Sequence, residues 1–137
     1  MGHGKPYTGY CDTRHMIDHL SIQCANLAAS AAFYDAVLAP LGGTRIDGGD
    51  AVGYGTGGRP DFWIGQQTTG AGFRESHIAF TAASREAVRA FFDAAIDEGA
   101  RILHEPRVWP DYHEAYYAGF VRDPDGNNVE AVCHLPE

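Results

Sequence analysis

The alternation of apolar and polar residues predicts a strand, a helix and then three short strands in the first half of the chain. Residues 16–24 have the pattern of a strand, and Asn26 after them is a good helix N-cap. Apolar positions at helical spacing continue to Gly42-Gly43, where the helix is expected to end. Glycines separate the three short β-type segments that follow: 44–46, 51–55 and 61–64.

The same order of elements is predicted again after a polar, glycine-containing linker at residues 66–74. A strand over 75–81 precedes Ser84, a second N-cap, and a helix whose apolar face ends before Gly99. A loop over residues 104–114 is expected to interrupt the last strands, which are predicted at 101–103, 115–122 and 127–134.

The two halves are related in sequence. A shift of 58 residues places His19 on His77 and the cap Asn26 on the cap Ser84, and it aligns AAFYDA with RAFFDA. One unit of strand, helix and three strands is therefore present twice, as modules over about 16–65 and 75–134. Two copies that face each other are the simplest arrangement of such a pair.

Composition limits the function. A chain of 137 residues suffices for one domain, expected over 16–137 after a polar arm at 1–15. No run of about 18 apolar residues and no leader pattern is found, so we expect a cytoplasmic protein without a membrane partner. The net charge of −8 argues against nucleic acid. Three cysteines without a CxxC pair argue against a disulfide framework or a thiolate zinc site.

Three potential metal ligands share one face of the predicted strands. Side chains alternate along a strand, so His19, His77 and Glu130 all point away from the helix side. Two imidazoles and a carboxylate suit a divalent metal and leave positions for water, substrate or O₂. A cation would also stabilise a carboxylate inside an apolar strand. The alternatives are hydrogen-bonded core histidines and an ion pair between Glu130 and Arg122. His134 shares the face of Glu130, but we regard it as peripheral because it lies at the chain end.

Further residues are candidates for lining this site. His113 is a candidate proton-transfer group, because the usual pKa of histidine lies near 6.5. A surface-loop histidine is the alternative, and Tyr116 is a second catalytic candidate. Arg122 either holds an anionic group or supports the DPDG turn. Three large rings are candidates for an aromatic wall around the substrate or for ordinary core packing: Trp63, Trp109 and Phe120.

Three segments occur in the order expected of one protein family: IDHLSIQCANLAASAAFYDAVLAPLGG, ESHIAFTA and YYAGFVRDPDGNNVEAVCH. Together they resemble the vicinal oxygen chelate superfamily, which includes glyoxalase I, extradiol dioxygenases, and fosfomycin- and bleomycin-resistance proteins. The resemblance covers about residues 16–134. It implies an α+β fold in which two βαβββ modules form a curved mixed-sheet cup with helices on the outside. It also implies that one divalent metal ion (Fe, Mn, Zn or Ni) is held by His19, His77 and Glu130.

Two departures from the family pattern bear on function. Glyoxalase I has a fourth, carboxylate ligand where this chain has Trp63, so a three-ligand site is expected. Dioxygenases and fosfomycin-resistance enzymes usually carry a tyrosine ten residues before the metal-binding glutamate, where this chain has Phe120. The resemblance implies a lyase, isomerase or ring-cleaving dioxygenase that chelates a small substrate through vicinal oxygens. The missing carboxylate argues against the glyoxalase I type, and Phe120 argues against the dioxygenase type. The alternative is a metal-free ligand-sequestering protein of the bleomycin-resistance type.

The resemblance also bears on assembly. Single-chain members of the superfamily are commonly homodimers, and we expect a homodimer here. In some members the cup forms across the interface, so that His19 of one subunit joins His77 and Glu130 of the other. Whether this site lies within one chain or between two is left open by the sequence.

Overall fold

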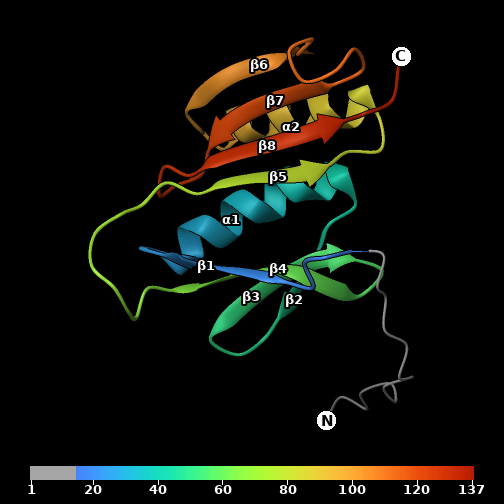
Figure 1. The fold of residues 1–137 in the computed structure, drawn as a ribbon. Coiled ribbons are helices and arrows are strands. Elements are labelled where there is room, and N and C mark those ends of the chain that lie inside the picture. The colour runs from blue at the N-terminus through green and yellow to red at the C-terminus, as the bar shows by residue number, and fades with distance from the viewer. Residues whose placement is uncertain (1–14) are drawn as a thin grey trace.

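The computed structural model describes residues 15–137, which fold into two four-stranded sheets, each with one long helix (Figure 1). The expectations for residues 1–14 lie outside this range. The first module contains β1 (Leu20–Cys24), α1 (Leu27–Leu38), a 3₁₀ turn η1 (Ala39–Leu41), β2 (Thr44–Asp47), β3 (Ala51–Thr56) and β4 (Arg59–Gln66). The second contains β5 (His77–Thr81), α2 (Arg85–Asp97), β6 (Ile102–Val108), β7 (Tyr117–Arg122) and β8 (Asn128–Cys133).

The two sheets have equivalent topologies, which confirms the repeat seen in the sequence. Their strand orders are β1-β4-β3-β2 and β5-β8-β7-β6. In each sheet the first strand pairs in parallel with the last strand of its module, and the other pairs are antiparallel. The fold is therefore α+β, with two βαβββ modules, as expected.

Both long helices begin at the predicted caps. The side-chain oxygens of Asn26 and Ser84 each accept a hydrogen bond from the backbone N–H three residues further on, at 3.1 and 3.0 Å. The first helix continues through η1 to Gly42, which has a φ of +82°, and the second is followed by Gly99, with a φ of +76°. Glycine adopts this left-handed conformation without the steric cost that a side chain adds.

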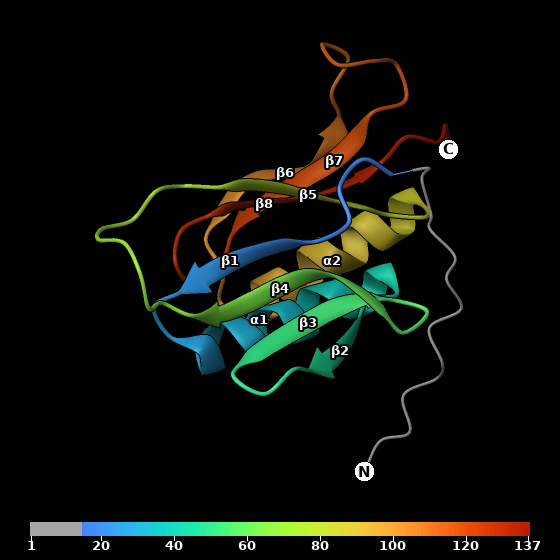
Figure 2. The same cartoon turned by 60° about the horizontal axis from the view of Figure 1, so that its bottom comes forward.

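The helix-covered faces of the two sheets meet in one shared core. The helices α1 and α2 pack against each other. Figure 1 shows α2 behind β7 and β8, and Figure 2 shows α1 behind β3 and β4. The strand residues predicted to face the helices include five that are buried in this core: Cys24, Ile78, Val129, Ala131 and Cys133.

Two predicted boundaries were wrong. The first strand begins at Leu20 and not at residue 16, because β1 pairs with β4 only from Leu20 onward. The loop expected over 104–114 is strand as far as Val108. β6 is an edge strand, and its register with β7 shifts between His104 and Arg107. Pro106, which cannot donate to a sheet, is accommodated at this irregularity.

No helix in the described part of the chain has the length and apolar character needed to span a membrane.

Candidate functional site

His77 and Glu130 are in direct contact on the helix-free face of the second sheet. Their strands β5 and β8 are parallel neighbours, and Ala79 is the register partner of Glu130. His77 lies two residues before Ala79 and therefore on the same face. Its Nε2 is 2.8 Å from Oε1 of Glu130. The side chain of Glu130 is 2% exposed and that of His77 is 54% exposed, so the pair joins a buried carboxylate to an accessible imidazole.

The second carboxylate oxygen of Glu130 is held by Tyr116. The Tyr116 hydroxyl donates a hydrogen bond to Oε2 of Glu130. Burial and the neighbouring Glu130 raise the pKa of the Tyr116 phenol, so it stays a donor at neutral pH. The charge inside this apolar strand is thus stabilised by two side-chain contacts. Neither contact involves Arg122, the ion-pair partner that the sequence offered for Glu130.

His19 lies apart from this pair. It precedes β1 and its side chain is 60% exposed, with Nδ1 2.7 Å from Oδ1 of Asp18. Among residues 15–137 of a single chain, no three His, Cys, Asp or Glu side chains are grouped so that they could hold a metal ion. The chain therefore brings together two of the three expected ligands, His77 and Glu130.

His113 forms a pair with His134 beside Tyr116. Nδ1 of His113 accepts a hydrogen bond from the backbone N–H of Ala115 at 3.0 Å, and its Nε2 is 2.8 Å from Nδ1 of His134. In the neutral pair, Nε2 of His113 must then carry the proton that it donates to His134. The two imidazole rings lie 5.5 and 5.3 Å from the ring of Tyr116. His134 is thus part of this cluster; its position on the same strand face as Glu130 was the available signal.

Two of the predicted wall residues pack together, and one of them, Phe120, lies next to His77. The ring of Phe120 is 6.0 Å from that of His77 and 5.2 Å from that of Trp109. The Trp109 indole N–H donates to the carbonyl of Ala118 at 3.0 Å, which fixes the ring, and the Arg107 guanidinium stacks over it at 3.4 Å. Phe120 is buried in a small apolar cluster against which Trp109 packs, so this cluster lies beside His77.

The other two predicted lining residues lie elsewhere. Trp63 is on β4 of the first sheet, where it covers Gly53. Arg122 donates hydrogen bonds to Glu75 at 3.0 Å and to the carbonyl of Gly126 at 2.6 Å. Its guanidinium thus supports the DPDG turn, which was the second of the two alternatives for this residue.

Comparison with known proteins identifies the family. Residues 16–131 match the Glyoxalase/Bleomycin resistance protein/Dioxygenase superfamily, and the chain belongs to it. A search of curated proteins found no match.

Solved structures have the same fold. A glyoxalase/bleomycin resistance protein from Albidiferax ferrireducens T118 is 29% identical with a TM-score of 0.75, over 89% of this chain and 100% of that one. A putative glyoxalase from Bacillus halodurans is 27% identical with a TM-score of 0.69, over 88% and 96% of the two chains. A lactoylglutathione lyase from Agrobacterium tumefaciens is 21% identical with a TM-score of 0.62, over 85% and 92%, a likeness of fold alone.

His77 and Glu130 provide part of a ligand set for the divalent metal that the family typically binds. Imidazole nitrogen and carboxylate oxygen are common ligands of divalent transition metals. Two such ligands, each about 2.1 Å from a metal, lie about 3 Å apart at neighbouring corners of an octahedral shell and about 3.4 Å apart in a tetrahedral one. The separation of 2.8 Å between His77 Nε2 and Glu130 Oε1 is closer to the octahedral value. The pair thus suits two adjacent coordination positions, and a third protein ligand has to come from elsewhere.

Proposed function

We propose that the protein is a homodimeric, divalent-metal-dependent enzyme of the glyoxalase/dioxygenase type that acts on a small oxygen-bearing substrate. In this proposal His19 of one subunit completes the site formed by His77 and Glu130 of the other. The observation that carries it is the 2.8 Å contact between His77 and Glu130 on an open sheet face, with His19 left exposed on the other module.

The exposure of the pair supports an assembly across subunits. The side chain of His77 is 54% exposed, so the face that carries His77 and Glu130 remains open within one chain. A two-fold dimer in which the first sheet of each subunit covers the second sheet of the other would place His19 over that face twice, by symmetry.

The side chains around the pair have separable roles. When bound, a divalent metal acts as a Lewis acid toward two neighbouring oxygens of the substrate. Tyr116 holds Oε2 of Glu130 and leaves Oε1 and His77 Nε2 as the ligand atoms. Phe120 and Trp109 provide an apolar wall next to them. We assign proton transfer to His113. The Ala115 N–H fixes the tautomer of His113, and Nε2 of His113 contacts His134, to which a proton can pass.

Metal content tests the proposal most directly. The protein is purified anaerobically without a metal-affinity step, and its metals are measured by elemental analysis alongside three variants: His19→Ala, His77→Ala and Glu130→Ala. The proposal expects about one metal ion per wild-type chain and its loss in each variant. A wild-type protein that takes up no metal after reconstitution contradicts the proposal.

Mixing two inactive variants tests whether the site spans two chains. The variants His19→Ala and His77→Ala are unfolded together and refolded as a mixture. In a cross-subunit site, each mixed dimer regains one intact site, and random assembly makes about half of the dimers mixed. Metal binding should then return to about a quarter of the wild-type level. A site within one chain predicts no recovery, and a monomer at micromolar concentration also contradicts the dimer.

A metal-free ligand-binding protein is the second candidate. The observation in its favour is that both oxygens of Glu130 already accept hydrogen bonds, from His77 and Tyr116, with no metal needed to satisfy them. Under this alternative, His77→Ala leaves ligand binding intact. Under the enzyme proposal, the same substitution abolishes metal binding and activity together.

A further inference from the structure

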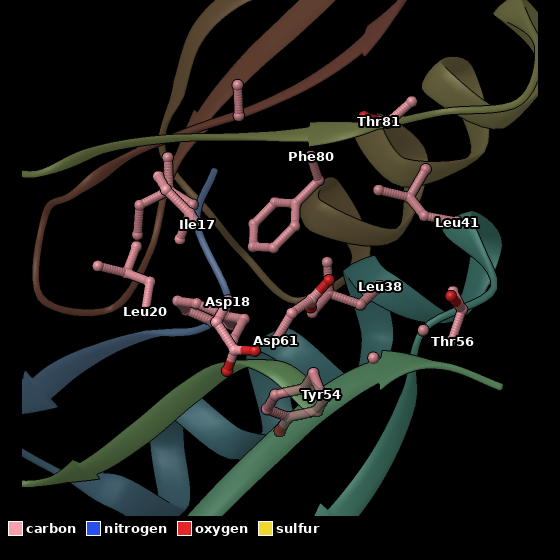
Figure 3. A pocket seen from close by; sticks show the side chains of 15 residues that line it. Ile17, Asp18, Leu20, Leu38, Leu41, Tyr54, Thr56, Asp61, Phe80 and Thr81 are labelled. Atoms are coloured by element: carbon pink, nitrogen blue, oxygen red, sulfur yellow. The ribbon is translucent and has the colours of Figure 1, made fainter. Parts of the chain in front are cut away.

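A separate cavity lies between the two modules. It has a volume of about 380 Å³ and is bounded by β1, β4, β5 and the end of the first helix (Figure 3). Pockets that bind small molecules typically measure about 300–1,000 Å³. None of the residues of the proposed centre or its phenol contact lines the cavity: His19, His77, Glu130 and Tyr116. This space is therefore distinct from the candidate site.

Most of the wall is apolar. Phe80 enters from β5, and Leu38 and Leu41 lie at the end of the first helix (Figure 3). The hydroxyl of Tyr54 donates a hydrogen bond to Asp35 at 2.8 Å, so Tyr54 presents its ring to the cavity. An apolar group of a ligand would gain free energy by leaving water for this surface, at about 25 cal/mol per Å² buried.

The charged residues that line the cavity in the described part of the chain are two carboxylates, Asp18 and Asp61, and no Lys, Arg or His of residues 15–137 lines it. Asp18 also contacts Nδ1 of His19 at 2.7 Å, outside the cavity lining. Figure 3 shows both aspartates on the same side of the space, with the ring of Phe80 across from them. In a chain of net charge −8, this arrangement repels anions and attracts cations. An aromatic ring opposite two carboxylates also suits a cation with an apolar body.

Two strand edges border the cavity. β1 pairs only with β4, and β5 only with β8, so both are edge strands, and residues of both border the cavity. The outer edge of such a strand carries N–H and C=O groups that the sheet does not use. An ammonium group has three donors and no acceptor, so backbone carbonyls complement it as carboxylates do.

We propose that this cavity binds a small primary ammonium ion that carries an apolar or aromatic group. The ammonium group faces Asp18 and Asp61, and the apolar group faces Phe80 and Leu38. The two sites share no residue, but Asp18 contacts His19 of the proposed metal centre at 2.7 Å. The charge test below therefore uses Asp61, so that either proposal can fail alone.

Nuclear magnetic resonance of the ¹⁵N-labelled full chain tests the proposal with three probes of similar shape and different charge. These are 2-phenylethylammonium, neutral 2-phenylethanol and anionic phenylacetate. The ammonium ion should shift the backbone amides of Leu38, Tyr54 and Phe80 saturably. The alcohol should bind more weakly, and the anion should produce no saturable shift of these amides.

Matched variants locate the charge that is recognised. Asp61→Asn should weaken binding of 2-phenylethylammonium about two- to fivefold, as expected for the loss of one partly exposed charge pair. Asp50→Asn removes an exposed carboxylate that is not in the wall and should leave the affinity unchanged. His77→Ala should also leave it unchanged, which separates this site from the proposed metal centre.

Several outcomes would overturn the proposal. One is equal affinity for the alcohol and the ammonium ion, and another is the absence of saturable shifts at Leu38, Tyr54 and Phe80. Shifts centred on His77 would assign the probe to the other site. Shifts of the cavity amides that depend on protein concentration alone would assign the cavity to contact between chains.

Discussion

Tyr34 of the first module donates a buried hydrogen bond to Asp123 of the second, with 2.7 Å between the phenolic oxygen and Oδ2. Tyr34 is 0% exposed and Asp123 is 4% exposed. Asp123 also accepts from the backbone and side-chain N–H groups of Asn127, both at 2.9 Å. Asp125 of the same turn accepts from the backbone N–H of Ala25 at 3.0 Å. The DPDG turn therefore joins β7 to β8 and also connects the second module to the first helix and to the residue Ala25 before it.

Tyr34→Phe should destabilise the protein by about 1–3 kcal/mol, because Asp123 stays buried and loses one of its donors. Urea denaturation at neutral pH measures the free energy of unfolding. Tyr112→Phe is the matched control, since Tyr112 is 63% exposed, and its effect should stay within about 0.5 kcal/mol. Equal unfolding midpoints for the two variants would show that the contact between the modules adds nothing to stability.

Stability should fall in alkali. Burial raises the pKa values of Tyr34, Tyr54 and Tyr116, and their partners Asp123, Asp35 and Glu130 add to the effect. In the unfolded chain a tyrosine titrates near pH 10. The folded state thus holds these protons more tightly, so this contribution to stability is complete below about pH 10 and decreases as the pH rises above it.

Tyrosinate absorbance and circular dichroism, followed together against pH, check this expectation. These three phenols should ionise only as the protein unfolds, in a cooperative step that coincides with the loss of secondary structure. Tyr34→Phe should make the fall of stability with pH less steep. Complete ionisation of all tyrosines while the circular dichroism stays native would contradict the expectation.

The elements set by local interactions could be predicted from the sequence. An N-cap such as Asn26 or Ser84 acts on a backbone N–H three residues away, so its effect is visible in a short segment. Strand alternation also predicted which strand faces are buried, because Cys24 and Cys133 alternate with residues on the free face. Both lie in the shared core.

Features that depend on distant partners could not be predicted in the same way. The start of β1 at Leu20 is set by pairing with Phe62, 42 residues away in sequence. Nothing in the run from residue 16 shows where that pairing begins. The contact of Tyr116 with Glu130 likewise requires that the chain between β6 and β7 returns the phenol over β8. The strand alternation that placed His77 and Glu130 on one face says nothing about the placement of a loop residue.

Gly55→Ala should destabilise the first sheet. A Cβ atom at Gly55 would lie 1.9 Å from the carbonyl oxygen of Arg59, next to a register shift between β3 and β4. The backbone has to move, at a cost of about 1–3 kcal/mol. Gly65→Ala is the control on the neighbouring strand, because its Cβ would meet no atom within 4 Å. Thermal unfolding of both variants tests this explanation. We expect a clear loss of stability for Gly55→Ala alone, and similar losses of stability in the two variants would contradict the steric explanation.

Tyr116→Phe should weaken metal binding about 10- to 100-fold while the fold remains, because partners that orient a ligand typically contribute this much to affinity. Without the hydroxyl, Oε2 of Glu130 loses its donor and the carboxylate is free to turn away from His77. Competition with a chelating dye for zinc or nickel measures the affinity, and circular dichroism checks the fold. Tyr112→Phe is the control, since its ring lies 4.7 Å from that of Tyr116. An unchanged affinity in Tyr116→Phe, with a lost affinity in Glu130→Ala, would show that Glu130 binds metal without help from the phenol. Unchanged affinity in both variants would remove Glu130 from the proposed centre.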